Sequence, residues 1–157
     1  MKPRTLFAAL LFVFLVSCGD VESKLPESDD PSTLTVSIED FVETEPVTEF
    51  IVDSESEYAR TVLLTVNEEV TAIRYYHLLA DADSTGEWSY TEAETLSTID
   101  ALAAEESIAV QLEMPELLPN RGIAMRDKSG REHRYFFSDS GEDGSPLLTE
   151  YMPGEAK

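Results

Sequence analysis

The chain has 157 residues, of which 32 are Asp or Glu and 11 are Lys or Arg, so its formal net charge is −21 at pH 7. This balance argues against nucleic-acid binding, which depends on Lys and Arg that neutralise phosphates. It also argues against docking of the protein surface itself on anionic lipid. The acids are spread along the whole chain, which favours a solubilising surface over a dedicated site for a basic partner or divalent cations.

The N-terminal residues have the organisation of a secretory signal. Lys2 and Arg4 form a positive start, and Leu6 to Val16 form an apolar run. A membrane-spanning helix needs about 20 apolar residues, so this run is too short to be one. The pattern predicts a signal peptide over residues 1–17.

The end of the signal, Leu15-Val16-Ser17-Cys18, resembles the lipobox of bacterial lipoproteins, and the resemblance covers residues 1–19 only. It implies that the chain is cut before Cys18, that Cys18 is lipidated, and that several acyl chains anchor it stably to a membrane. Cys18 is the only Cys, so it has no intramolecular disulfide partner. The resemblance thus implies a location in the bacterial cell envelope, and Gly19 favours the outer membrane.

The segment after Cys18 is polar, acidic and contains Pro. It has too few apolar residues to offset the entropy of ordering, so residues 18–33 are expected to form a flexible acidic tether. A tether of about 15 residues would hold a domain on the order of 20 Å from the membrane. The remainder is long enough for a single domain at 34–152, followed by a short tail at 153–157.

From Leu34 onward the apolar residues mostly recur at every second position, which predicts β-strands. "DKSGR" at 127–131 predicts a hairpin turn with Gly130 in the left-handed conformation. "NEE" at 67–69 predicts a second hairpin connection, with a weaker signal because it lacks Gly. The predicted strands cover residues 34–38, 49–53, 59–66, 70–79, 107–113, 122–127, 131–138 and 146–151.

One segment breaks the period of two. Residues 91–107 are rich in Ala and Glu and place Leu96, Ile99 and Leu102 at spacings of three. This spacing predicts a short helix at 91–104 that crosses between sheets. A long acidic loop remains the alternative.

Seven or eight short strands separated by turn signals predict a mainly β fold, an antiparallel β-sandwich. The Cys…Trp…Cys pattern of antibody domains is missing, so the sandwich is immunoglobulin-like in architecture only. A small open barrel is the alternative.

A candidate cation site lies in "DSGEDGSPLLTE", residues 139–150. Its spacing follows an EF-hand loop, with Asp139, Asp143, the carbonyl of Ser145 and Glu150 as calcium ligands. Gly141 has no side-chain oxygen at the third position, and "RYFF" before the loop predicts a strand where an EF-hand needs a helix. The sequence therefore favours a plain turn, with a looser calcium loop as the alternative. No other cofactor is expected.

A candidate binding platform is formed by aromatic residues in the predicted strands. Adjacent residues of a strand point to opposite faces, so some of these rings are expected outside the core. Core packing is the favoured role of these rings, and exposed rings that bind a sugar or a protein are the alternative. The platform residues are Tyr75, Tyr76, Trp88, Tyr135 and Phe137.

No catalytic residues are predicted, because His77 and His133 belong to no metal or nucleophile motif. The sequence favours a membrane-anchored, non-catalytic binding or accessory module whose partner is an envelope protein or glycan. A small calcium-binding protein is the second hypothesis. An envelope hydrolase, with His133 in a triad, is the third.

Overall fold

The structure is a computed structural model that describes residues 33–115 and 118–153. The predicted signal peptide, Cys18 and almost all of the tether therefore lie outside the described residues. The described residues belong to one compact unit, Ser32–Lys157. Within them, no helix is long and apolar enough to cross a membrane.

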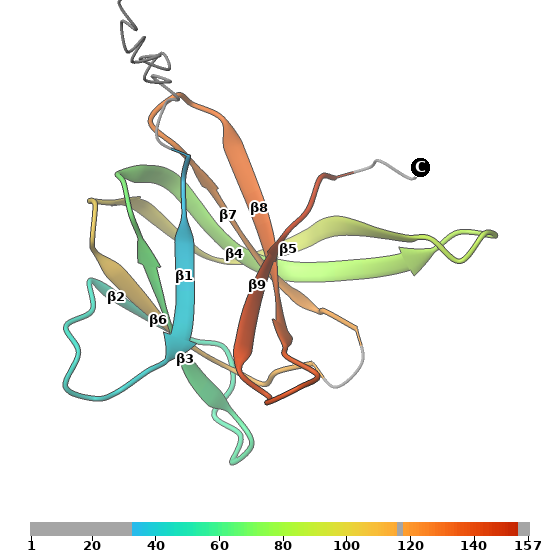
Figure 1. The fold of residues 1–157 in the computed structure, drawn as a ribbon, viewed down its shortest axis with the longest axis horizontal. Coiled ribbons are helices and arrows are strands. Elements are labelled where there is room, and N and C mark those ends of the chain that lie inside the picture. Colours follow the sequence, from blue (N-terminus) through green and yellow to red (C-terminus); the bar gives the residue numbers. More distant parts are fainter. Residues whose placement is uncertain (1–32, 116–117, 154–157) are drawn as a thin grey trace, which may run out of the picture. The chain divides into compact units, whose positions relative to one another are not determined.

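Nine strands make up the described fold, and they form two sheets (Figure 1). One sheet has four strands in the order β1-β3-β6-β2, and the other has five in the order β5-β4-β7-β8-β9. Neighbouring strands are antiparallel except β2 and β6, which are parallel. The predicted mainly β, antiparallel sandwich is confirmed. The strands are β1 Val36–Asp40, β2 Glu49–Val52, β3 Arg60–Val66, β4 Val70–Ala82, β5 Trp88–Leu102, β6 Ser107–Leu112, β7 Arg121–Arg126, β8 Glu132–Asp139 and β9 Pro146–Glu150.

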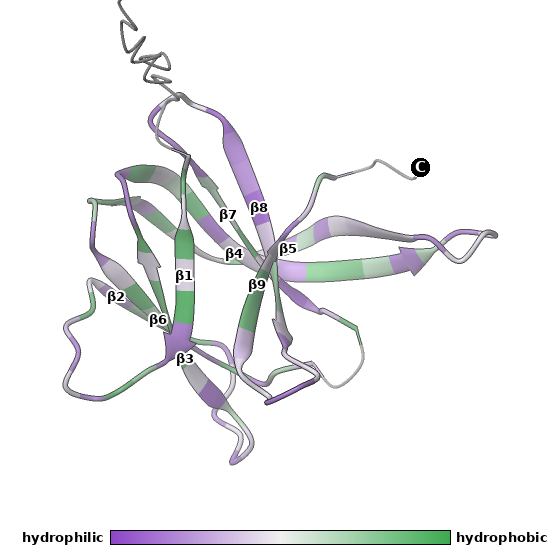
Figure 2. Ribbon diagram, in the orientation of Figure 1, coloured by the Kyte–Doolittle hydropathy of each residue, from purple (hydrophilic) through white to green (hydrophobic). Residues whose placement is uncertain are grey.

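The core follows from alternation along the strands. Every second side chain of a strand points to the same face, and Figure 2 shows hydrophobic and polar residues alternating along β1. In β3 the residues Val62, Leu64 and Val66 are buried, and in β8 the residues Tyr135 and Phe137 join the same cluster. The principal core is thus made by alternate residues of both sheets.

The prediction of a short helix at 91–104 is wrong, because these residues belong to the long strand β5, which pairs with β4. Ile99 lies opposite Ile73, and Leu102 lies opposite Val70. Leu96 has no opposite residue, because the register shifts between Ser97 and Thr95. In this strand, pairing with a distant segment outweighs the helical preference of Ala and Glu.

The prediction of a hairpin at 67–69 is also wrong, since β3 and β4 lie in different sheets. The connection carries the chain from one sheet to the other. Asn67 holds it in place, because its side-chain oxygen accepts a hydrogen bond from the backbone N–H of Thr35 at 2.8 Å. By contrast, the predicted turn at 127–131 does join the paired strands β7 and β8, and Gly130 has a φ of 84°.

Two ion-pair clusters link the sheets at separate places. Asp53, which follows β2, accepts hydrogen bonds from Arg121 Nε at 2.6 Å and from Tyr75 Oη at 3.2 Å. Arg60, which begins β3, contacts Asp40 and also donates to Asp139 at the end of β8, at 3.1 Å. Each cluster connects elements of the four-stranded sheet to elements of the five-stranded sheet.

Candidate functional site

The loop proposed to bind calcium is the turn of the β8–β9 hairpin. Ser140 donates its backbone N–H to the carbonyl of Ser145 at 2.8 Å, and Gly144 has a φ of 70°. The Asp143 carboxylate accepts the backbone N–H of Ser145 at 3.0 Å. Hydrogen bonds from the backbone and side chain of Ser145 and from the side chain of Ser140 lower the pKa of Asp143 to about 2. Asp143 thus has the role expected of an Asp that stabilises a turn.

The four predicted calcium ligands are not brought together. Asp139 pairs with Pro146 at the turn and contacts Arg60 at 3.1 Å. Glu150 lies four residues beyond Pro146, about 13 Å further along the strand. Among residues 33–115 and 118–153, no group of three or more His, Cys, Asp or Glu is placed to hold a metal ion.

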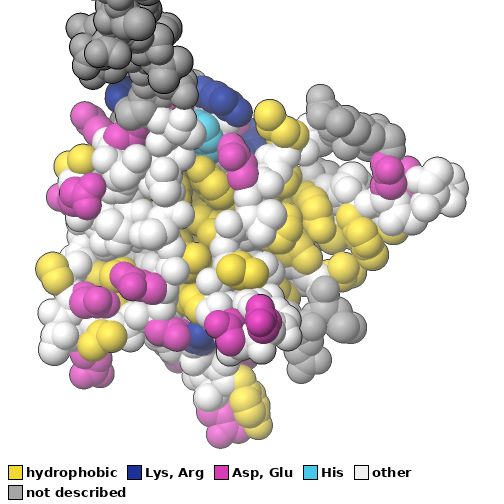
Figure 3. Space-filling model, in the orientation of Figure 1, with side chains coloured by type: hydrophobic (Ala, Val, Ile, Leu, Met, Phe, Trp, Pro, Cys, Tyr) yellow, Lys and Arg dark blue, Asp and Glu magenta, His cyan; other side chains and the backbone are white. Residues whose placement is uncertain are grey.

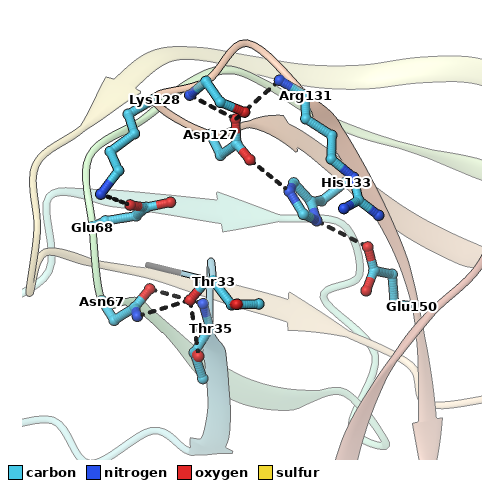
Figure 4. Close-up of polar contacts among 10 residues, drawn as sticks. Thr33, Thr35, Asn67, Glu68, Asp127, Lys128, Arg131, His133 and Glu150 are labelled. Atoms are coloured by element: carbon cyan, nitrogen blue, oxygen red, sulfur yellow. Dashed lines mark hydrogen bonds and ion pairs between the residues drawn. The ribbon is translucent and has the colours of Figure 1, made fainter. Parts of the chain in front are cut away.

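Glu150 instead belongs to a charged triad with a buried His (Figure 4). His133 Nδ1 lies 2.9 Å from Glu150 Oε1, and His133 Nε2 lies 3.0 Å from Asp127 Oδ2. Both ring nitrogens therefore face carboxylate oxygens, one at each side of the ring. Ser129 Oγ is bonded to Asp127 at 2.6 Å and not to the ring. The triad therefore holds the β7–β8 turn to β9 and lacks the arrangement of a Ser-His-Asp nucleophile.

Asp127 makes the stability of this turn depend on pH. Hydrogen bonds from Ser129 and His133 hold the pKa of Asp127 well below its usual range. A lowered folded-state pKa gives stability that is present above the unfolded-state value, about 3.9, and is lost as the pH falls through the folded-state value. We expect the free energy of unfolding, measured in urea from about pH 6 to pH 2, to fall more steeply for the wild type than for Asp127→Asn. Parallel curves would contradict this role.

The five predicted platform residues do not share one surface. Tyr75, Tyr135 and Phe137 lie in the core between the sheets. The rings of Tyr75 and Phe137 pack edge to face, with their centroids 5.9 Å apart. Tyr76 is buried on the opposite face of the five-stranded sheet. Trp88 alone is largely accessible, with 47% of its surface exposed. For the first three residues, core packing is the role that the structure shows.

A second aromatic cluster covers the outer face of the five-stranded sheet, which points away from the four-stranded sheet. The hydroxyl groups of Tyr76 and Tyr151 form a hydrogen bond of 2.8 Å. The ring of Tyr90 lies 4.9 Å from that of Phe136 and 5.7 Å from that of Tyr151. Tyr151 follows the last strand, so its place in this cluster has no signal in the alternation of the sequence.

Beside the aromatic cluster lies a network of ion pairs. Arg74 makes two bonds of 3.1 Å to the two carboxylate oxygens of Glu92, and a third of 3.2 Å to Glu132. Arg134 also donates to Glu132, at 2.7 Å. Burial works to raise the pKa of Glu132, but the bonds from Arg134 and Arg74 hold it below its usual value. The network fixes charged groups of β4, β5 and β8 on one face.

An open pocket of about 540 Å³ lies where the cluster and the network meet. It offers one aromatic ring, one carboxylate and one guanidinium, all partly exposed. Figure 3 shows hydrophobic side chains gathered over the neighbouring β4–β5 hairpin. The pocket is lined by Tyr90, Thr91, Glu92, Ala93, Arg134 and Pro153.

This pocket is the candidate functional site, and its chemistry suits binding. A ring provides apolar contact, while fixed charges orient a polar ligand. The sequence singled out neither Arg134 nor Glu92, because their proximity depends on the pairing of β5, β4, β7 and β8. Comparison with protein-family models, curated proteins and solved structures finds no significant match, so the residues of this chain alone carry the functional argument.

Proposed function

We propose that this protein is a lipid-anchored lipoprotein of the bacterial cell envelope, and that its β-sandwich is a non-catalytic binding module. The outer-face pocket beside Tyr90 is its binding site. The anchor is supported by the lipobox-like Leu15-Val16-Ser17-Cys18. The observation that carries the binding module is the combination of a partly exposed ring with a preformed Arg–Glu network in one pocket. Such groups need no rearrangement to meet a ligand, which lowers the entropic cost of binding.

Binding is favoured over catalysis because the charged groups of the pocket neutralise one another. Glu92 is bonded through both oxygens to Arg74, and Arg134 is bonded to Glu132. A general acid or base has to exchange a proton with its substrate, whereas these groups present fixed charges. The proposed partner is another envelope protein.

The first test concerns the anchor. Cys18→Ala removes the proposed lipidation site and is expected to move the protein from the membrane fraction to the soluble fraction of the cell. Ser23→Ala, a matched change in the tether, should leave the protein in the membrane. Mass spectrometry of the N-terminal peptide would show acyl chains on Cys18. Membrane retention of Cys18→Ala would refute the lipoprotein proposal.

The second test concerns the pocket. A photo-cross-linking amino acid at Thr91, which lines the pocket, should capture one defined partner in cells. The same amino acid at Ser37, exposed on the four-stranded sheet, should not. Trp88→Ala in the Thr91 protein should reduce the yield, because Trp88 is exposed two residues from Tyr90. Equal yields of cross-linked product from Thr91 and Ser37 would contradict a specific site. If the captured partner resists protease, the partner is a glycan and not a protein.

A further inference from the structure

The five-stranded sheet has one long open edge, formed by β5. The edge strands β1 and β9 of the two sheets lie next to each other, and the edge strand β2 has only four residues. β5 has fifteen residues and pairs only with β4. Figure 1 shows the β4–β5 hairpin extending beyond the other strands. An open edge presents unpaired backbone N–H and C=O groups to which another strand can bond.

Bulges limit the part of this edge that a strand can use. Leu96 has no opposite residue, and Ala93 and Glu94 together lie opposite His77. Bulges twist an edge and interrupt pairing. From Trp88 to Glu92, however, the register with β4 is continuous. This five-residue segment is the regular part of the edge nearest the hairpin loop.

The backbone of Trp88–Glu92 is oriented for pairing. The N–H of Asp83 donates to the carbonyl of Glu87 at 2.9 Å, which makes them a bonded pair of the β4–β5 ladder. Bonded and non-bonded pairs alternate in antiparallel strands. The amide groups of residues 88, 90 and 92 therefore point away from β4, toward the open edge.

The candidate pocket lies along the same segment, because Tyr90, Thr91 and Glu92 form part of its wall. When a peptide adds to a sheet edge, the backbone bonds give affinity, and pockets that accept alternate side chains give specificity. Trp88, 47% exposed, adds apolar surface on the same hairpin. Edge and pocket can thus contact one extended ligand.

The charge of this region selects the ligand. No Lys or Arg occurs in the sequence between Arg74 and Arg121, whereas this stretch includes Asp81, Glu87 and Glu94 among its acids. The cations beside this edge, Arg74 and Arg134, are already paired with Glu92 and Glu132. A second copy of β5, which has no Lys or Arg of its own, would place acids against acids. An extended segment with Lys or Arg side chains would complement the edge.

We propose that the Trp88–Glu92 edge binds an extended, basic polypeptide segment by strand addition, with one side chain in the pocket beside Tyr90. This inference rests on the proposed function, since it names the partner class and binding mode of the same site. It predicts main-chain hydrogen bonds from residues 88, 90 and 92, and an affinity that falls as ionic strength rises.

The test uses the full chain purified in detergent and an acetylated, amidated peptide of about ten residues that alternates Lys and Thr. Hydrogen exchange should slow at residues 88–92 when the peptide is added. A peptide N-methylated at alternate residues keeps its charge but cannot pair, and a peptide with Glu in place of Lys keeps its backbone. Each of these two peptides should bind at least about tenfold more weakly than the Lys peptide.

Charge variants show whether the Lys peptide is attracted by acids near the β5 edge or by the net charge of the whole protein. Glu87→Lys with Glu94→Lys should weaken peptide binding about tenfold. Glu39→Lys with Glu49→Lys changes the net charge equally at exposed positions of the four-stranded sheet, and should have little effect.

Three outcomes would overturn the inference: equal binding of the N-methylated peptide, no binding of the Lys peptide, or protection of β5 that depends on protein concentration alone. The last would identify a second copy as the occupant. If the Thr91 cross-link still forms in these cases, the binding module stands and only strand addition is wrong. If the cross-link also fails, the proposed function is wrong as well.

Discussion

Gly122→Ala is expected to lower the free energy of unfolding by about 1–3 kcal/mol, because the buried site has no room for a methyl group. A Cβ atom on Gly122 would lie 2.5 Å from Cε2 and 2.8 Å from Cζ of the Tyr76 ring. Tyr76 is fully buried, and its hydroxyl is bonded to that of Tyr151, so the ring cannot move aside freely. Urea unfolding of the full chain would measure the loss.

Two variants show whether the loss comes from this contact. Gly141→Ala should leave stability nearly unchanged, because nothing lies within 4 Å of the added Cβ. Tyr76→Leu is expected to destabilise the protein by itself, but Gly122→Ala should cost less in that background, since the ring is gone. Full additivity of the two changes would contradict the proposed clash.

Asp53→Ala is expected to cost about 2–4 kcal/mol, because it leaves two donors without their acceptor in a poorly hydrated place. The side chains of Asp53 and Arg121 are only 10% and 18% exposed. Burial and the charge of Asp53 raise the pKa of Tyr75, so its hydroxyl stays protonated and donates to Asp53. The loss should be seen as a lower midpoint in urea and a lower melting temperature.

Other substitutions in the cluster of Asp53, Arg121 and Tyr75 show how much each contact contributes to the loss of stability. Tyr75→Phe removes one neutral donor and should cost about 0.5–1.5 kcal/mol. Arg121→Ala combined with Asp53→Ala should cost less than the sum of the single changes, because each removes the other's partner. Asp81→Ala, at an exposed position of β4, should stay within about 0.5 kcal/mol of the wild type. An Asp53→Ala loss no larger than that of Asp81→Ala would refute the cross-sheet role.

Local sequence signals predicted most of the strands and two of the turns. "DKSGR" encodes the β7–β8 turn, because Gly130 adopts a φ of 84° that other residues rarely adopt. "SGEDGS" encodes the β8–β9 turn, where Asp143 accepts the N–H of Ser145. Such signals act over a few residues and do not depend on the rest of the fold.

Predictions failed where pairing between distant segments decides the structure. β5 gains its partner from β4, and this pairing outweighs the helical preference of its Ala and Glu residues. The connection at 67–69 changes sheets because β3 pairs with β1 and β6, while β4 pairs with β5 and β7. In residues 139–150 the predicted calcium ligands are separated, because Glu150 lies on the extended strand β9, away from the turn.

The mainly β class, the alternating core residues and the two hairpin turns can be predicted from the sequence, because they depend on side-chain periodicity and local backbone preference. Which strands share a sheet is known only from the three-dimensional fold, since it depends on contacts between residues far apart in the chain. The fold also places Tyr90, Glu92 and Arg134 around one pocket, where β5 and β8 contribute side chains to the same outer face. The candidate site arises from this pairing, because no single stretch of the sequence contains all of its parts.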